Sequence, residues 1–506
     1  MATSLHGRFR RRQPGSGAGR CHGTDQRRSQ GSSWEMKMKL AAIFLASCVA
    51  LPAIADTPAP APIDHFTPGT VTTADAGFLG KPKVYLPTGT VTGAVFLFSD
   101  ANGWGAEEEA AAVKMQGEGA AVVGVDTVTM FAALEQNKTD DCVYLVSDIE
   151  DLSHRIQRGL GTPNYFSPIV AGVGTAGALG LAIAAETPDA TMGHTVSIDP
   201  TLAVPLLKPI CTDAPHVAAN GGTVYGLAQG DLTNPVDVYF TSAGAQDSKD
   251  HVALLQSQGF AIKTKDVDTT PFDALQARLD KLLAPPTDDN PLADLPLVSL
   301  PAKPTHGTMA IVYSGDGGWR DLDKSIGDVF QKEGVPTIGV DSLRYFWSKK
   351  TPEQTSADLA RIISVYSELW GVNRVILVGY SFGADMLPAA YNGLPIVEKA
   401  QVAQMSLLGL SEQVDYEISV GGFLGTSSGD GATLPEFAKI KPALVQCVYG
   451  EEEDDSACLK LQNTGIEMIK TTGGHHFDGD YEGLANKILD GLKRRVAHTG
   501  YPLAEK

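Results

Sequence analysis

An internal repeat is the feature that most constrains the fold of this chain. The segments 94–104 and 309–319 both run from an apolar stretch into a Ser-x-x-x-Gly-Trp pattern, and their matching residues lie 215 positions apart. The same spacing, without a gap, carries Gly-Val-Asp at 124–126 to Gly-Val-Asp at 339–341. Matches at one fixed spacing indicate a duplication. We therefore predict two tandem domains of one fold, called the first copy and the second copy below.

Within each copy, short runs of β-forming residues alternate with helical stretches. This alternation is typical of parallel βαβ units, whose sheet is covered by helices on both faces. In the second copy the predicted strands are 310–313, 337–340, 375–378, 402–408 and 443–449, and the predicted helices are 321–333, 355–370, 384–392 and 481–495. The predicted fold class is α/β, with two three-layer domains built on parallel sheets.

Proline content sets the boundary between the copies. Six prolines between residues 284 and 306 predict a linker, which gives 56–283 to the first copy and 307–506 to the second. Residues 1–35 are rich in arginine and lack an apolar period, so we expect a disordered basic extension there.

The next segment, residues 36–55, has the pattern of an export signal. Two lysines precede an apolar stretch too short to span a membrane, and Ala-Ile-Ala at 53–55 fits a cleavage site. The sequence thus predicts a periplasmic protein. In an alternative interpretation, Leu-Ala-Ser-Cys at 45–48 is a lipoprotein box, and lipidation of Cys48 would anchor the protein to a membrane.

Cysteine usage agrees with export. Beyond the signal the chain has four cysteines, an even number that favours disulfides in an oxidising compartment. Three pairings are possible, of which Cys142–Cys211 with Cys447–Cys458 keeps each bond within one copy. Four buried thiols are the alternative. Neither CxxC nor a Cys/His cluster with metal spacing occurs, so we expect no metal site and no cofactor.

Charge limits the class of partner. The net charge is −19, and arginine is concentrated in the first 35 residues, so the remainder is more acidic still. Nucleic-acid binding needs clustered Lys and Arg and is disfavoured, whereas a cationic partner is favoured.

The chemistry is predicted from Gly-Tyr-Ser-Phe-Gly at 379–383. An apolar strand precedes this G-x-S-x-G pattern and a helix-compatible segment follows it, which is the context of a nucleophile elbow with Ser381 as the nucleophile. The glycines allow the sharp turn from strand to helix. A second match, around Ser427, has no helix after it and is interpreted as a loop.

An activated serine needs a base and an acid that orients the base, which follow it in the order acid, histidine. The strand at 443–449 runs into five consecutive acidic residues, among which we predict Asp454, with Asp455 as the alternative. The histidine is predicted to be His475 in a Gly-rich loop, with His476 as the alternative.

Amides and side chains near the serine complete the predicted site. The oxyanion hole is expected to use the Phe382 amide and an amide of Gly315 or Asp316. The residues predicted to line the substrate pocket are Arg344, Tyr345, Trp347 and Trp319. Packing of such aromatic residues against the sheet is the alternative interpretation.

The first copy is predicted to have kept the fold and lost the chemistry. Gly-Val-Gly at 172–174 stands where the second copy has Gly-Tyr-Ser, and its closing segment 260–271 contains no histidine. A displaced nucleophile at Thr175 is the alternative, but no base is predicted near it.

Taken together, these motifs resemble the bacterial virulence protein VirJ/AcvB family. The resemblance covers the export signal and both copies, and it is most specific in the segments 314–319, 343–347, 379–385 and 474–477. It implies a periplasmic serine hydrolase of the α/β-hydrolase fold. It further implies hydrolysis of lysyl-phosphatidylglycerol, with release of lysine from the lipid head group, and a part in virulence or secretion.

The predicted function is therefore an exported serine hydrolase acting on an ester of an aminoacylated phospholipid at the membrane surface. Envelope or secretion-system proteins are the other expected partners. Two alternatives stay open at this point: a non-catalytic periplasmic scaffold and a generic lipase or thioesterase.

Overall fold

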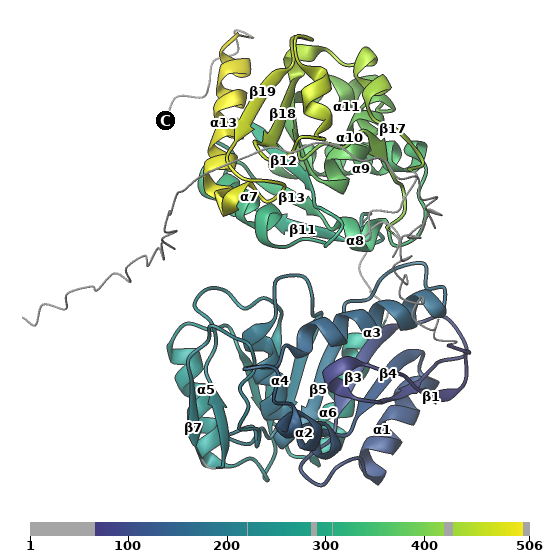
Figure 1. Ribbon diagram of the computed structural model, residues 1–506, viewed down its shortest axis with the longest axis vertical. Coiled ribbons are helices and arrows are strands. Elements are labelled where there is room, and N and C mark those ends of the chain that lie inside the picture. The colour runs from purple at the N-terminus through teal and green to yellow at the C-terminus, as the bar shows by residue number, and fades with distance from the viewer. Residues whose placement is uncertain (1–65, 220, 285–290, 306, 419–428, 499–506) are drawn as a thin grey trace, which may run out of the picture. The chain divides into compact units, whose positions relative to one another are not determined.

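The computed structural model describes residues 66–219, 221–284, 291–305, 307–418 and 429–498. The predicted basic extension, the export signal with Cys48, and Ser427 lie outside these residues. Figure 1 shows the helices and strands.

The first copy is built on an eight-stranded sheet of order β1-β2-β4-β3-β5-β6-β9-β10. Its strands β1 and β2 pair antiparallel with their neighbours, and the others pair in parallel. The strands are β1 (Val71–Thr73), β2 (Lys83–Tyr85), β3 (Gly93–Phe98), β4 (Ala120–Val125), β5 (Ile169–Val173), β6 (His194–Ile198), β9 (Val236–Phe240) and β10 (Lys263–Asp266). The helices are α1 (Ala106–Gly117), α2 (Thr127–Gln136), α3 (Leu145–Gly159), α4 (Thr175–Glu186), α5 (Gln246–Ser257) and α6 (Pro271–Leu283).

The second copy has a seven-stranded sheet of order β11-β13-β12-β14-β15-β18-β19, parallel except for β11. Its strands are β11 (Leu297–Leu300), β12 (Thr308–Tyr313), β13 (Thr337–Val340), β14 (Arg374–Tyr380), β15 (Val402–Leu408), β18 (Val445–Gly450) and β19 (Glu467–Thr471). Its helices are α7 (Asp321–Lys332), α8 (Ser342–Tyr345), α9 (Pro352–Trp370), α10 (Phe382–Asn392), α11 (Ile396–Gln401) and α13 (Tyr481–His498). Apart from β1, the two sheets share one strand order, as a duplication requires.

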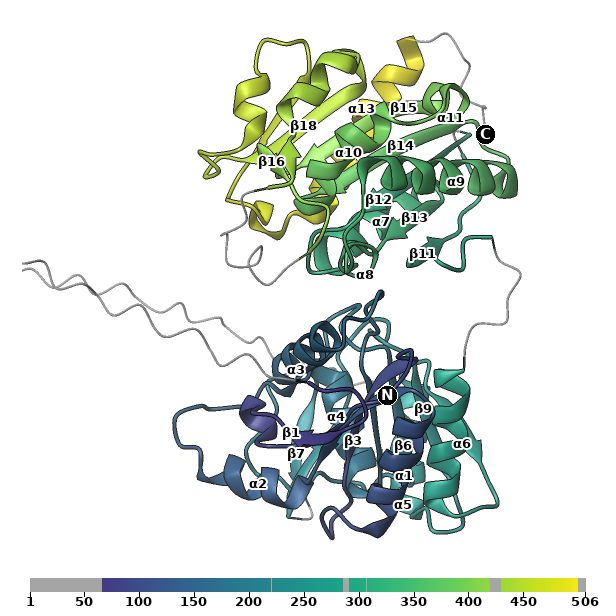
Figure 2. The ribbon, with the colours of Figure 1, turned by 90° about the vertical axis from the view of Figure 1, so that its right-hand side faces the viewer.

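Each sheet is covered on both faces. In the second copy, α9 and α10 lie on one side of the sheet, and α7 and α13 lie on the other (Figure 2). Ile311 packs with residues of α9 and α10, whereas its neighbour Val312 packs with residues of α7 and α13. Successive residues of a strand point to opposite faces, so the two clusters are the two sides of one sheet. The predicted three-layer α/β class is confirmed.

Part of the predicted linker belongs to the second sheet. Residues Leu297–Leu300 form β11, which pairs antiparallel with β13 at the edge of that sheet. Prolines flank the strand at 296 and 301. Since an edge strand needs hydrogen bonds on one side only, proline is tolerated next to it, and proline content alone overestimates the length of a linker.

In each copy, the tryptophan of the repeated Gly-Trp pattern packs against the glycine of the repeated Gly-Val-Asp pattern. A Cβ atom added at Gly339 would lie 2.4 Å from the Trp319 ring, and one at Gly124 would lie 2.3 Å from the Trp104 ring. In both copies the indole therefore lies flat against a strand that has no side chain at that point. The repeated tryptophan and glycine that indicate the duplication therefore form the same packing contact in both copies.

Ser314, the first residue of the repeated Ser-x-x-x-Gly-Trp pattern, also has a structural role. Its hydroxyl accepts a hydrogen bond from the Ser342 amide at 2.9 Å, and the Ser99 hydroxyl accepts one from the Thr127 amide at 3.0 Å. All four residues are buried. The contact ties the end of the first parallel strand to the end of its neighbour in each copy.

The predicted disulfides are confirmed, with one bond in each copy. Cys142 pairs with Cys211, and Cys447 pairs with Cys458. The second bond joins β18 to the short helix Ala457–Leu461 and so closes the loop that carries the acidic run.

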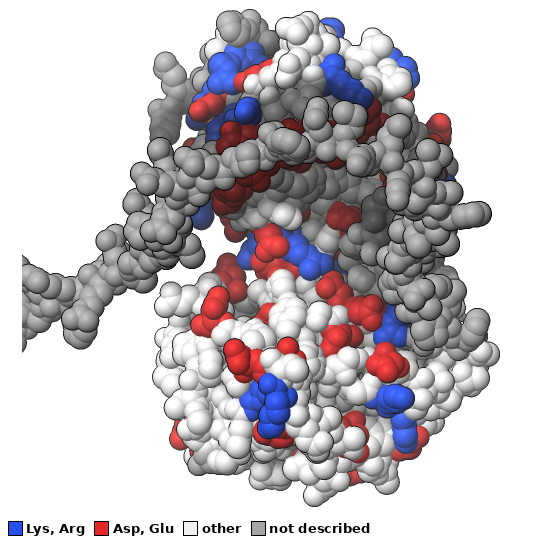
Figure 3. All heavy atoms as spheres, in the orientation of Figure 1, with Lys and Arg blue, Asp and Glu red and all other residues white. Residues whose placement is uncertain are grey.

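The surface of the described residues is mixed in charge. Figure 3 shows Asp and Glu side chains among Lys and Arg on the visible face. Among the described helices, none combines the length and apolar character needed to cross a membrane.

The Trp–Gly contact gives a prediction for stability. Gly339→Ala and Gly124→Ala place a methyl group inside the indole contact, and each should lower the free energy of unfolding by about 1–3 kcal/mol because overpacking forces neighbouring atoms apart. Gly117→Ala, where a Cβ would meet nothing within 4 Å, is the matched control and should leave stability unchanged or slightly raised. Thermal unfolding of the three variants checks this, and equal midpoints would contradict it.

Candidate active site

The turn between β14 and α10 has the geometry of a nucleophile elbow. Ser381 follows the strand at φ 50° and ψ −118° and caps the helix, a conformation that is strained for a residue other than glycine. A Cβ atom at Gly379 would lie 2.4 Å from the Gly383 carbonyl oxygen, and one at Gly383 would lie 2.4 Å from the Tyr313 carbonyl oxygen. Both glycines are therefore needed for the strand, the turn and the helix to approach this closely.

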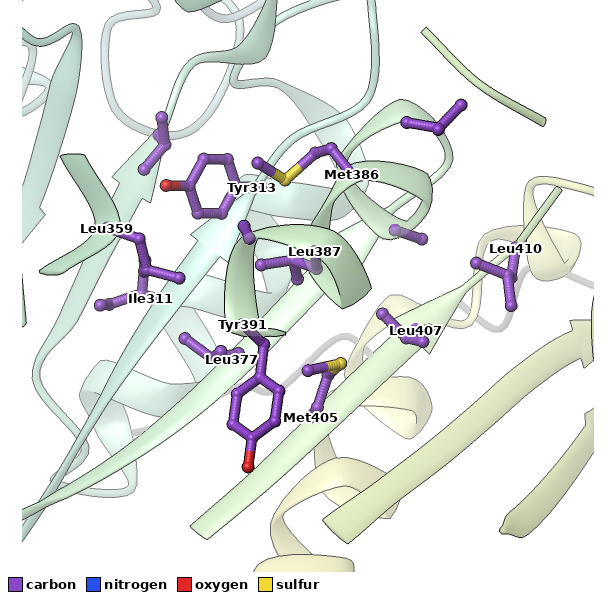
Figure 4. Packing of buried hydrophobic residues seen from close by; sticks show 14 of the residues in the cluster. Ile311, Tyr313, Leu359, Leu377, Met386, Leu387, Tyr391, Met405, Leu407 and Leu410 are labelled. Carbon is purple, nitrogen blue, oxygen red and sulfur yellow. The ribbon is translucent and has the colours of Figure 1, made fainter. Parts of the chain in front are cut away.

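Helix α10 is fixed to the sheet behind this turn. Its Met386 and Leu387 are fully buried and belong to the same cluster as Leu377 of β14 and Leu407 of β15 (Figure 4). The helix that begins at Ser381 is thus held by core packing, and the serine side chain is placed at the carboxyl end of the sheet.

His475 lies next to this serine. Its Nε2 atom is 2.9 Å from Ser381 Oγ, and its Nδ1 atom is 2.7 Å from Glu453 Oε1. A carboxylate at Nδ1 favours the tautomer with the proton on Nδ1, which leaves Nε2 as an acceptor for the serine proton. Ser381 is partly exposed, and 43% of the His475 side chain is exposed, so both groups can meet a substrate.

The acid differs from the prediction. Glu453, rather than Asp454 or Asp455, contacts the imidazole, and both aspartates are exposed. The chain turns directly after β18, where the Glu453 amide donates to the Gly450 carbonyl at 3.1 Å and the Gly450 amide donates to Glu453 Oε2 at 2.7 Å. This turn directs the third acid of the run back over the strand end and the next two into solvent.

Hydrogen bonds keep Glu453 ionised. Burial acts to raise the pKa of its carboxyl, but hydrogen bonds from His475 and from the Gly450 amide outweigh burial, and the pKa lies below its usual value. A charged carboxylate at this point stabilises a protonated imidazole.

His476, the alternative histidine, does not reach the serine. Its Nδ1 atom lies 3.1 Å from the Tyr380 hydroxyl. The two neighbouring histidines therefore have different partners, and His475 is the one placed to act on Ser381.

The loop that follows β12 passes beside the serine. A Cβ atom at Gly315 would lie 3.8 Å from Ser381 Cβ. The Gly315 amide is directed to the buried carboxyl of Asp323, whose pKa is raised well above its usual value by burial although that hydrogen bond lowers it. The Gly315 amide is thus engaged by Asp323, and the oxyanion role of the Asp316 amide stays a prediction. The Phe382 amide is the first of α10 and lacks an intrahelical acceptor.

Three of the predicted pocket residues are part of the core. Trp319, Tyr345 and Trp347 are at most 4% exposed, and the Tyr345 hydroxyl donates to Asp358 at 2.6 Å. Trp319 covers Gly339 as described above. The alternative interpretation, packing against the sheet, fits these aromatic residues, whereas Arg344 is exposed.

A groove that the sequence analysis missed runs along α10. Its volume is about 710 Å³, and it is lined by α9, α10, Val414, Tyr416 and residues of the segment 430–439. Its charged residues are Glu353, Asp385, Asp430, Glu436 and Lys439. Asp385 lies one turn beyond Ser381 and accepts a hydrogen bond from the Ser411 amide at 2.7 Å. The only signal in the sequence was Asp385, two residues after the G-x-S-x-G pattern.

Burial raises the pKa of Asp385 well above its usual value, although the Ser411 amide lowers it. A cation placed in the groove would favour the ionised carboxylate. Among the described residues there is no group of three or more His, Cys, Asp or Glu side chains that could hold a metal ion.

The first copy has the same turn without the chemistry. Gly174 adopts φ 61° and ψ −118°, nearly the values of Ser381. The Asp100 carboxylate lies over it: the Thr175 amide, which corresponds to the Phe382 amide, donates to Asp100 Oδ1 at 2.8 Å. A Cβ atom at Gly174 would lie 2.4 Å from that oxygen. Thr175 itself is buried, which disfavours it as a displaced nucleophile.

A second carboxylate fills the place of the histidine. A Cβ atom at Gly409, after β15, would lie 2.6 Å from the His475 ring. The corresponding residue after β6 is Asp199, whose Oδ1 accepts a hydrogen bond from the Thr241 amide at 2.7 Å. Two glycines that leave room for the serine and histidine in the second copy are thus aspartates in the first.

Comparison with known proteins identifies the second copy. Residues 307–496 match the family model described as Bacterial virulence protein (VirJ). This part of the chain belongs to the VirJ family. The predicted resemblance is confirmed for the VirJ domain, as residues 307–496 are called below. No curated protein matches the chain.

Several solved structures are similar to parts of the chain. Proline iminopeptidase of Mycobacterium smegmatis is 11% identical with a TM-score of 0.30, covering 40% of this chain and 95% of that one. Est1E from Butyrivibrio proteoclasticus is 14% identical with a TM-score of 0.31, covering 40% and 93%. The LpqC poly(3-hydroxybutyrate) depolymerase of Bordetella parapertussis is 15% identical with a TM-score of 0.29, covering 41% and 91%. Such low scores carry no information about what this chain binds or cleaves.

The strand order and the elbow themselves show the α/β-hydrolase architecture. In that fold the nucleophile lies on a strained turn between a strand and a helix at the top of a parallel sheet, as Ser381 does between β14 and α10. The VirJ domain is thus a hydrolase-fold domain.

The contact between Glu453 and His475 predicts a pH-dependent contribution to stability. Glu453→Gln should lower the free energy of unfolding by roughly 1 kcal/mol at pH 7, a modest value because His475 is partly exposed. Since the pKa of Glu453 is lower in the folded chain than its usual value of 4.5, the advantage of the wild type should persist above that pH. It should disappear as the pH falls through the folded pKa.

Thermal unfolding from pH 7 to pH 3 measures this advantage, and Asp454→Asn is the matched control. The control should follow the wild type at every pH. A loss for Asp454→Asn that equals the loss for Glu453→Gln would contradict the assignment of the acid.

Proposed function

We propose that the VirJ domain is a serine ester hydrolase with Ser381 as nucleophile, His475 as general base and Glu453 as the acid that orients the base. The observation that carries this proposal is the continuous hydrogen-bonded chain from Ser381 through His475 to Glu453 at a nucleophile elbow. A non-catalytic scaffold would not require a serine, a histidine and a carboxylate joined by hydrogen bonds in this order.

The reaction follows from the positions of the groups. Ser381 Oγ attacks the ester carbonyl carbon while His475 Nε2 takes the hydroxyl proton. The amides of Phe382 and Asp316 would stabilise the negative charge on the carbonyl oxygen. His475 then gives its proton to the leaving alcohol, and an acyl group stays on Ser381. Water, activated by the same imidazole, releases the acid and restores the serine.

The proposed substrate is the aminoacyl ester of lysyl-phosphatidylglycerol at the membrane surface. Cleavage would place the lysyl group on Ser381 and release phosphatidylglycerol as the alcohol. In the acidic groove beside α10, Asp430 and Glu436 form ion pairs with Lys349 and Lys439. Support for a cationic head group therefore comes from Glu353 and from the net charge of −19, since carboxylates attract an ammonium group. Two disulfides are consistent with export, and we place the reaction in the periplasm, with a role in virulence or in envelope lipid homeostasis.

Two measurements on the full chain purified after export test this function. A fluorophosphonate probe should label the wild type and fail to label Ser381→Ala. Vesicles containing lysyl-phosphatidylglycerol should release free lysine with the wild type, and the rate should fall on the order of 10³-fold or more in Ser381→Ala.

Ser427→Ala, in the second G-x-S-x-G match, is the matched control and should keep both activities. Gly174→Ser on the Ser381→Ala background should restore no labelling, because Asp100 occupies that turn. Labelling that survives Ser381→Ala would overturn the proposal. Labelling without lysine release would reject the lipid substrate and favour a lipase or thioesterase.

A further inference from the structure

The residue before Ser381 is a buried tyrosine that the proposed reaction does not use. Tyr380 ends β14 and is 8% exposed. Its hydroxyl lies 3.1 Å from His476 Nδ1 and 3.4 Å from the His475 carbonyl oxygen. The phenol therefore joins the strand that carries the serine to the loop that carries the histidine.

The Tyr380 ring also contacts two other parts of the site. Its centroid lies 5.3 Å from that of the His475 ring, with 33° between the ring planes. A Cβ atom at Gly315 would lie 3.2 and 3.3 Å from two carbons of the same ring, so the oxyanion loop passes directly over it. One side chain thus contacts the imidazole and the loop that would supply an oxyanion amide.

The histidine loop needs such support because its backbone is strained. Phe477 and Asp478 both have positive φ angles, 53° and 52°. Such a backbone conformation is unfavourable for a residue other than glycine and persists only where its surroundings impose it. The Phe477 side chain, 1% exposed, anchors the loop in the core, and the Tyr380 hydroxyl holds the part of the loop nearest to Ser381.

The chemistry of the pair is that of a neutral hydrogen bond. Burial raises the pKa of Tyr380 above its usual value, so the phenol keeps its proton and is the donor. His476 Nδ1 accepts this hydrogen bond when the ring carries its own proton on Nε2. A side chain with an acceptor at the same position can take over this role.

We propose that Tyr380 is a positioning residue, whose hydroxyl, donated to His476 Nδ1, keeps His475 Nε2 at hydrogen-bonding distance from Ser381 Oγ. This inference rests on the proposed hydrolase function. The Tyr380 hydroxyl acts through His476 and the loop backbone rather than directly on Ser381 Oγ or His475 Nε2.

Kinetics of the full chain on p-nitrophenyl acetate test the proposal. Tyr380→Phe removes only the hydroxyl and should lower kcat about tenfold with little change in KM, because a misplaced base slows the chemical step. His476→Ala should lower kcat to the same extent. His476→Asn should recover most of the rate, since its Oδ1 atom can replace Nδ1 as the acceptor. The double variant Tyr380→Phe/His476→Ala should be no slower than either single variant, as expected for two ends of one contact.

Tyr391→Phe, in the last turn of α10, is the matched control, and it should keep the wild-type kcat. Thermal unfolding of all variants separates positioning from loss of folding: the drop in kcat should occur without a larger loss of stability than in Tyr391→Phe. Wild-type kcat in Tyr380→Phe, or no recovery in His476→Asn, would overturn the positioning role while leaving the hydrolase function intact. A wild type that neither hydrolyses the ester nor reacts with the fluorophosphonate would overturn both.

Discussion

The close contact between the backbones of Gly379 and Gly383 is the constraint on which the site depends. Because neither position has room for a side chain, β14 turns into α10 within a few residues, and Ser381 is forced to a positive φ angle at the turn. Core packing of α10 stabilises this strained residue. Glu453 follows β18 and His475 follows β19, and parallel pairing brings the ends of these strands and of β14 to one edge of the sheet.

The first copy shows that this turn does not require catalysis. Gly174 has nearly the same backbone conformation as Ser381. The first amide of the following helix, that of Thr175, donates a hydrogen bond to the Asp100 carboxylate. A helix N-terminus favours an anion, whether a carboxylate of the protein or a developing oxyanion. The helix N-terminus thus binds a carboxylate of the protein in the first copy and is free to bind an oxyanion in the second. The difference lies in the residue opposite the turn, which is Asp100 in the first copy and Gly315 in the second. A glycine there leaves space for a serine, and an aspartate fills it.

Much of this could be predicted from the sequence, and the exceptions have physical reasons. The strands and helices followed from periodicity, and Ser381 and His475 followed from glycine patterns that only a turn or a loop requires. Glu453 was missed because five acids in a row look alike, and only the hydrogen bond between its side chain and the Gly450 amide selects one. Trp319 was misjudged although a signal existed: Trp104 repeats it in a copy without a nucleophile, which indicates packing. The acidic groove depends on elements distant in sequence and could not be predicted from local patterns.

The most direct test of the account is a crystal structure of the protein after reaction with a fluorophosphonate. The phosphorus atom should be bonded to Ser381 Oγ, with one phosphoryl oxygen within hydrogen-bonding distance of the Phe382 amide and His475 still in contact with Glu453. In the first copy, Asp100 should still occupy the turn at Gly174. Phosphorus on another residue, or a phosphoryl oxygen directed away from the Phe382 amide, would contradict the account.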